Sequence, residues 1–120
     1  MDLTGQAALV TGGGRGLGRA FALALAKAGA KVAVTARTTA EVRETVEMVE
    51  RDGGQAVGIP GDVSEPGAVT EIVKTAESEL GPLEILVNNA GVMGPVGYNW
   101  NVNSEDFTHA SVTFIGTLDG

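Results

Sequence analysis

The sequence predicts an α/β fold, with a doubly wound parallel sheet and helices on both faces. Short apolar runs alternate along the chain with segments of helical periodicity, and these segments are too long to be hairpin loops. A glycine-rich turn follows the first apolar run, as is typical of a strand that leads into a helix. Because crossovers between parallel strands are right-handed, we expect four strands in the order 3-2-1-4.

The first apolar run, Ala7-Ala8-Leu9-Val10, predicts a strand over residues 7–11. It has no alternating polar residues, which indicates burial on both faces, as in a central parallel strand. The helix that follows is expected from about residue 15 to residue 28, and it ends at Gly29, a residue typical of helix C-termini. Residues 31–35 form the second predicted strand.

Thr38 and Glu41 predict the start of the second helix, because they have the spacing of a capping box. Asp52-Gly53-Gly54 ends this helix, and residues 55–59 form the third predicted strand. One face of the helix is apolar and is expected to pack on the sheet. The apolar positions are Val42, Val46 and Val49.

Ser64 is the expected cap of a third helix, which Gly81-Pro82 ends. The fourth predicted strand covers residues 83–87, and residues 92–105 have the composition of a loop. The segment 105–118 is expected to be a helix, although its β-branched residues leave a strand as the alternative.

Length and charge restrict the class of protein. We expect residues 1–120 to form a single domain. The net charge is −7, but residues 1–40 hold five basic residues and one acidic residue, so positive charge gathers near the glycine-rich turn. An acidic chain without a long apolar stretch or a targeting segment predicts a cytoplasmic protein that binds neither nucleic acid nor membranes. Cysteine is absent, and no metal site is expected.

The turn Thr11-Gly12-Gly13-Gly14-Arg15-Gly16-Leu17-Gly18 is the first candidate for a binding site. Glycines allow backbone N–H groups to approach an anion, and the following helix presents its positive end. The alternative is an ordinary strand-to-helix turn. Neither G-x-G-x-x-G nor a P-loop with its lysine fits the spacing. The turn and Asn88-Asn89-Ala90-Gly91 follow strands 1 and 4, so both lie where the strand order switches and ligands bind.

These motifs resemble the cofactor-binding half of the short-chain dehydrogenase/reductase family, whose fold is Rossmann-like. The matches are Thr-Gly-x-x-x-Gly-x-Gly, Asp62-Val63, Asn88 to Gly91 and Val112 to Gly116. The resemblance implies that the glycine loop binds a pyrophosphate, that Asp-Val contacts adenine and that Asn-Ala-Gly lies along the nicotinamide ribose. The implied cofactor-binding residues are Gly12, Gly14, Gly16, Leu17, Gly18, Asp62, Val63, Asn89, Ala90 and Gly91. Thr11 and Asn88 are expected to have structural roles.

The end of the second predicted strand favours NADP(H) over NAD(H). An enzyme that uses NAD places a carboxylate there for the ribose hydroxyls, whereas this chain has Ala36 followed by Arg37. A guanidinium can bind the 2′-phosphate of NADP in a bidentate manner, and Arg15 can add a second positive charge. The alternative for Arg37 is a solvated residue near the start of a helix.

No catalytic residue is predicted in this chain. Members of the resembled family use Tyr-x-x-x-Lys, but the single tyrosine, Tyr98, is followed four residues later by Val102. Thr113 stands where relatives often have asparagine, and His109 is expected on a helix surface. The chain is therefore expected to be incomplete relative to its family and inactive alone, with a small-molecule substrate only once a C-terminal half is present. The alternative is a non-catalytic dinucleotide-binding or interaction module.

The predicted strand order leaves the fourth strand at the edge of the sheet. Its residues are apolar, and an open edge of this kind can pair with another chain. Phe107 and Phe114 of the last predicted helix are candidates for exposure. We therefore expect a homo-oligomer.

Overall fold

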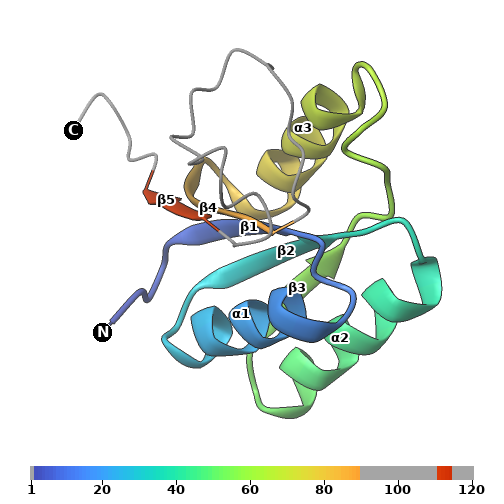
Figure 1. The fold of residues 1–120 in the computed structure, drawn as a ribbon. Coiled ribbons are helices and arrows are strands. Elements are labelled where there is room, and N and C mark those ends of the chain that lie inside the picture. Colours follow the sequence, from blue (N-terminus) through green and yellow to red (C-terminus); the bar gives the residue numbers. More distant parts are fainter. Residues whose placement is uncertain (1, 90–110, 115–120) are drawn as a thin grey trace.

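The computed structural model describes residues 2–89 and 111–114, which form one five-stranded sheet with helices on both faces (Figure 1). The strand order is β3-β2-β1-β4-β5. Strands β1 to β4 are parallel, which confirms the predicted order 3-2-1-4, whereas β5 is antiparallel to β4. The strands are β1 (Ala7–Thr11), β2 (Lys31–Thr35), β3 (Gln55–Gly58), β4 (Leu83–Asn88) and β5 (Ser111–Phe114).

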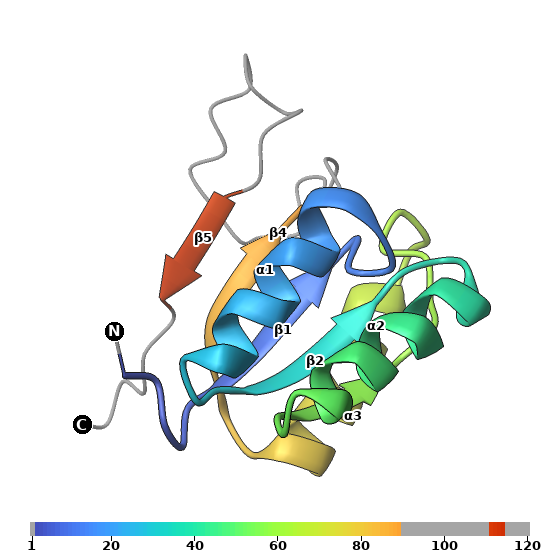
Figure 2. The same ribbon diagram turned by 90° about the horizontal axis from the view of Figure 1, so that it is seen from below.

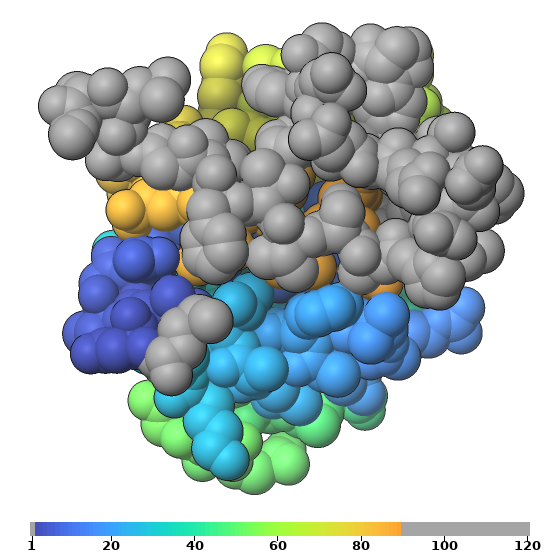
Figure 3. All heavy atoms as spheres, turned by 60° about the vertical axis from the view of Figure 1, so that its left-hand side comes forward, coloured from blue at the N-terminus to red at the C-terminus, as the bar shows by residue number. Residues whose placement is uncertain are grey.

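Three helices cover the sheet in two layers. Helices α1 and α2 lie on one face and α3 lies on the other (Figures 1 and 2). In the space-filling view the blue residues of α1 lie directly beside the green residues of α2, so the two form a continuous layer (Figure 3). The helices are α1 (Gly16–Lys27), α2 (Thr39–Arg51) and α3 (Ala68–Leu80).

Successive residues of the central strands supply the cores on opposite faces, because side chains alternate along a strand. Val10 belongs to the cluster under α1 and α2, whereas its neighbour Leu9 belongs to the cluster under α3. Both side chains are at most 1% exposed. The apolar first strand is therefore buried on both faces, as its composition predicts.

The register of the parallel strands brings three strand ends together. Thr11, the last residue of β1, pairs with Thr35 of β2 and with Asn88 of β4. The segments that leave these strands therefore start at the same edge of the sheet. This edge carries the glycine-rich turn.

The end of the chain differs from the prediction. Residues 111–114 form a strand and not part of a helix, and Leu86 and Val87 of β4 pair with Thr113 and Val112 of β5. The β-branched residues of this segment favour an extended backbone, and the open edge of β4 offers it hydrogen-bonding groups. Strand β4 is consequently not an edge strand, and Thr113 is not on a helix. Residue Phe107 and the rest of the predicted helix lie outside the described residues.

Two predicted helix caps are also wrong in detail. Helix α2 begins after Thr38, but the Thr38 side chain makes no capping hydrogen bond. Helix α3 begins four residues after Ser64, with Gly67 in a left-handed conformation (φ 83°) at its N-cap. The Ser64 hydroxyl instead donates to Asp62 Oδ1 (2.6 Å). At Ser64, a neighbouring carboxylate thus competes for the side chain that was expected to cap the helix.

Candidate functional site

The turn between β1 and α1 depends on glycines for its shape. Gly16 has φ +57°, a conformation that other residues rarely adopt. A Cβ atom on Gly18 would overlap the Gly12 carbonyl oxygen and would lie 2.7 Å from Asn89 Nδ2. The first turn of α1 therefore packs directly against the loop that precedes it, and only glycine at position 18 permits this contact.

Three polar residues fix the loop to the ends of the strands. The Asn89 N–H donates to Thr11 Oγ1 (3.0 Å), and Asn89 Nδ2 donates to the Gly12 carbonyl oxygen (3.2 Å). The Thr11 hydroxyl in turn donates to Asn88 Oδ1 (3.2 Å). The structural roles expected for Thr11 and Asn88 are confirmed, and Asn89 has a structural contact that the sequence did not reveal.

A second set of polar contacts holds the loop from the side of α2. The fully buried Thr45 hydroxyl donates to the Gly13 carbonyl oxygen (2.8 Å) and accepts a hydrogen bond from Arg19 Nε (2.9 Å). The guanidinium of Arg19 also donates to the Gly14 carbonyl oxygen and pairs with Glu44 (2.6 Å). Sequence reasoning missed this set, although a threonine between Val42 and Val49 on a buried stripe was the available signal.

The N-terminus of α1 has the properties of an anion site. No side chain caps it, and its first turn contains no acidic residue. The first N–H groups of a helix have no partner within the helix, and the helix dipole favours a negative charge there. Leu17 in this turn is 53% exposed, which is unusual for a large apolar side chain in the described part of the chain. An anionic ligand with an apolar surface would match both features.

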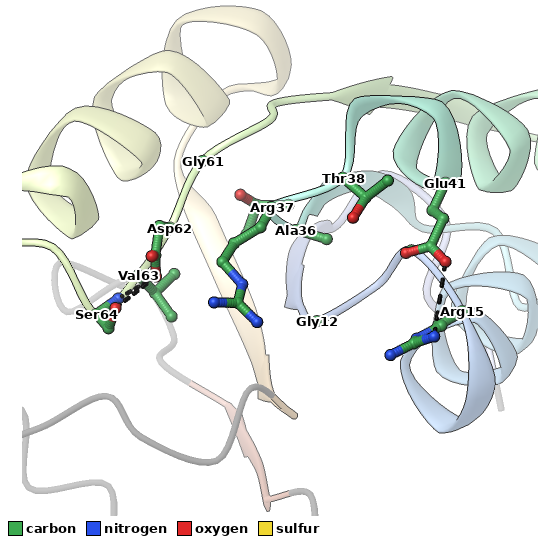
Figure 4. Close-up of a pocket in the computed structure, with 12 residues that line it drawn as sticks. Gly12, Arg15, Ala36, Arg37, Thr38, Glu41, Gly61, Asp62, Val63 and Ser64 are labelled. Atoms are coloured by element: carbon green, nitrogen blue, oxygen red, sulfur yellow. Dashed lines mark hydrogen bonds and ion pairs between the residues drawn. The ribbon is translucent and has the colours of Figure 1, made fainter.

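A cleft of about 360 Å³ opens beside this turn, at the carboxyl ends of β1, β2 and β3 (Figure 4). Its lining comes from the glycine loop, the end of β2 with the segment that leads into α2, the first turn of α2, and the segment between β3 and α3. The lining residues are Gly12, Gly14, Arg15, Thr35, Ala36, Arg37, Thr38, Glu41, Gly61, Asp62, Val63 and Ser64.

Charged groups face each other across the cleft. Arg15 and Glu41 lie on one side, with 3.9 Å between Arg15 Nη1 and Glu41 Oε2 (Figure 4). On the other side, hydrogen bonds from the Ser64 side chain and N–H hold the pKa of Asp62 below its usual value, and the nearby Arg37 lowers this pKa further. Asp62 is therefore ionised at neutral pH and can act as a hydrogen-bond acceptor.

Thr35, at the edge of the same cleft, has a buried hydroxyl without a partner among the described residues. Thr35 is fully buried, and its Oγ1 makes no hydrogen bond to any other described residue. A buried hydroxyl without a partner costs free energy, so Thr35 is expected to destabilise this edge of the sheet. Sequence reasoning assigned this residue only to the second strand.

Comparisons with known proteins agree with this geometry. A protein-family model described as short chain dehydrogenase matches residues 6–115. The chain belongs to the short chain dehydrogenase family. Hydroxysteroid dehydrogenase from Escherichia coli superposes with a TM-score of 0.73 and 36% sequence identity, over 78% of this chain and 40% of that one.

Two curated relatives differ in how much of their length the chain matches. Versicolorin reductase stcU of Emericella nidulans is 40% identical over 106 residues, which cover 88% of this chain and 40% of the reductase. The short-chain dehydrogenase/reductase homolog YusS of Bacillus subtilis is 45% identical over 93 residues, which cover 77% of this chain and 85% of YusS. This short chain dehydrogenase sequence thus spans two fifths of one relative and most of another.

In this member of the short chain dehydrogenase family, the predicted site residues fall into three groups. Half of them line the cleft together, namely Gly12, Gly14, Arg15, Arg37, Asp62 and Val63. Gly16, Leu17 and Gly18 form the first turn of α1, and Asn89 binds the loop. Ala90 and Gly91 lie outside the described residues, as do Tyr98 and His109. Within residues 2–89 and 111–114 no cluster of acidic or histidine side chains could hold a metal ion.

None of the described helices has the length and apolar character needed to cross a lipid bilayer.

Proposed function

We propose that this chain is the NADP(H)-binding part of an oxidoreductase that transfers hydride between the nicotinamide and a carbonyl or alcohol substrate. The observation that carries the proposal is the cleft between the glycine loop and the ends of β2 and β3. It combines an uncapped helix N-terminus with two arginines. When it is bound, the nicotinamide ring supplies or accepts the hydride.

The residues present fit such a dinucleotide. The backbone N–H groups at the start of α1 would hold the pyrophosphate, where a Cβ at Gly18 would close the loop. The ionised Asp62 carboxylate would accept a hydrogen bond from the adenine amino group, and Val63 would supply apolar contact.

The preference for NADP(H) over NAD(H) follows from the charges at the end of β2. Ala36 lines the cleft where a carboxylate would repel a 2′-phosphate, and the exposed Arg37 follows it. A charge-assisted hydrogen bond contributes about 1.5–3 kcal/mol, which corresponds to roughly tenfold or more in affinity. Arg15 supplies a second cation on the opposite side of the cleft (Figure 4).

The double variant Ala36→Asp/Arg37→Ile tests this preference. It introduces a carboxylate and removes a cation, so we expect it to bind NADH more tightly than NADPH, the reverse of the wild-type order. Arg43→Ile/Ala40→Asp on α2 is the matched control, because it makes the same change of charge at exposed positions outside the cleft. A double variant that still prefers NADPH would contradict the assignment.

A second candidate function is a dinucleotide-binding module without turnover. The observation that favours it is the similarity to YusS, because the matched residues cover 85% of the length of that protein. The coding sequence downstream of codon 120 distinguishes the two candidates. A continued reading frame that encodes Tyr-x-x-x-Lys supports the oxidoreductase, and a stop codon supports the module.

A further inference from the structure

Glu41 is an acidic residue within a cleft that is proposed to bind a phosphate. Its spacing from Thr38 predicts a capping role, but its carboxylate lies toward Arg15 at the end of the glycine loop (Figure 4). A Cβ on Gly14 would lie 2.9 Å from Glu41 Cβ, so the first turn of α2 packs closely on the glycine loop. This packing fixes the backbone of Glu41 next to the loop that carries Arg15.

The two partners of this ion pair differ in their exposure to solvent. The side chain of Arg15 is 81% exposed, whereas that of Glu41 is 34% exposed and lines the cleft. Glu41 is the partner of Arg15 in the ion pairs of the described residues. A guanidinium engaged by a carboxylate is less available to a second anion, because the new contact requires the old one to be lengthened or broken.

We propose that Glu41 is a specificity-determining residue that competes with the 2′-phosphate of NADP(H) for Arg15. Glu41 pairs with Arg15 beside the cleft, and it thereby lowers the affinity for the phosphate that distinguishes NADPH from NADH. The chain consequently discriminates between the two cofactors less than its two arginines alone would permit. The inference rests on the proposed function, and it adds a residue that opposes the preferred cofactor.

Other charges in the cleft do not replace Glu41 in this role. Asp62 lies on the opposite side with Ser64 and Arg37, and its hydrogen bonds hold it there. Glu44 lies one position before Thr45 on α2 and pairs with Arg19, and it does not line the cleft. Within the described residues, Glu41 is thus the acidic side chain placed to compete for Arg15.

Calorimetric titration of Glu41→Gln with NADPH and NADH tests the inference. An exposed ion pair is weak, so we expect the variant to bind NADPH roughly two- to fivefold more tightly and NADH with unchanged affinity. Glu47→Gln is the matched control, because it removes the same charge from an exposed position on α2 outside the cleft. It should leave the ratio of the two dissociation constants unchanged.

A second background separates competition for Arg15 from simple repulsion between Glu41 and the phosphate. In Arg15→Gln, the further change Glu41→Gln should alter the dissociation constant of NADPH by less than about twofold, because the competed group is absent. An equal gain with and without Arg15 would overturn the inference. So would a Glu41→Gln variant with wild-type affinity for NADPH, although the proposed function would then stand. A wild-type chain that binds neither cofactor would refute both.

Discussion

Two buried threonines show that the effect of a hydroxyl on the stability of the fold depends on its hydrogen-bond partners. Thr35 and Thr45 are both fully buried, but Thr45 bridges Arg19 and the Gly13 carbonyl oxygen, whereas Thr35 lacks a partner among the described residues. A satisfied hydroxyl stabilises a fold, and a buried one without a partner costs free energy. The two residues therefore predict opposite responses to the same substitution.

Thr45→Val should lower the free energy of unfolding by about 1–3 kcal/mol, because it leaves a buried carbonyl oxygen and a guanidinium N–H unpaired. Urea unfolding measures this change. Thr39→Val is the control, since Thr39 is exposed on the same helix, and it should change the free energy by less than about 0.5 kcal/mol. Equal effects at the two positions would show that the Thr45 contacts do not hold the loop.

Without added cofactor, Thr35→Val should leave the free energy of unfolding unchanged or raise it by up to about 1 kcal/mol, because an unpaired hydroxyl is replaced by a methyl group of similar size. A large loss of stability without cofactor would indicate that the Thr35 hydroxyl has a partner in solution.

The turn between β3 and α3 is an element whose stability depends on pH. The Ser64 side chain and N–H donate to Asp62, and these contacts lower the pKa of the carboxyl from its ordinary value of 3.8. A folded-state pKa below the unfolded value means that ionised Asp62 stabilises the fold above about pH 4. This stabilisation is lost as the pH falls through the folded-state pKa.

Ser64→Ala should therefore raise the pKa of Asp62, and it should destabilise the protein at pH 7 more than at pH 2. An NMR titration of the Asp62 carboxyl measures the first effect, and urea unfolding at the two pH values measures the second. Asp2 is an internal control, because Thr4 lowers its pKa in the same way and should continue to do so. A pKa of Asp62 that does not respond to Ser64→Ala would contradict the account.

Strand β5 is the element that sequence patterns placed in the wrong class. Thr113→Ala separates the two structures, because alanine is a poorer strand former and a better helix former than threonine. Pairing with β4 predicts that the variant loses up to about 1 kcal/mol of unfolding free energy, measured in urea. The expected control, Thr113→Val, should be close to neutral. An increase in stability in the alanine variant would support the helix.

The rest of the sheet was predictable because its signals agree with one another. Apolar strands, helices that end at Gly29 and Gly81 and the glycine loop all indicate one parallel order. Near residue 113 the signals for a helix and for a strand conflict, and pairing with β4 favours the strand. Within the site, the backbone loop and the cleft arginines were predictable from their types. The partners of Thr45 and Glu41 were not, because they depend on how α2 packs against a loop distant in sequence.

At the scale of the whole molecule, the sheet edge available for self-association belongs to β5 and not to β4. Strand β4 is covered by β5, which with β3 is one of the two outermost strands of the described sheet. Its outer side is an edge that can pair with a second copy, so we propose a homo-oligomer. Sedimentation at micromolar concentration should show a species larger than the 12.2 kDa chain. A single species of the chain's own mass at all concentrations would contradict the proposal.

The 120-residue chain should show no turnover with NADP(H) and simple carbonyl compounds or alcohols. Hydride transfer to a carbonyl needs a positioned acid of suitable pKa, and Tyr98 has no lysine four residues later. Turnover is measured as the change in the absorbance of the reduced nicotinamide of NADPH. Turnover that disappears in Tyr98→Phe would contradict the expectation.

The central claim is that the cleft binds a dinucleotide and prefers the one with a 2′-phosphate. Calorimetric titration of the wild-type chain with NADPH and with NADH, at one salt concentration, tests it most directly. We expect NADPH to bind with the lower dissociation constant, by roughly tenfold, because Arg37 and Arg15 face a cleft in which Ala36 brings no opposing charge. Equal dissociation constants for the two cofactors, or tighter binding of NADH, would contradict the account.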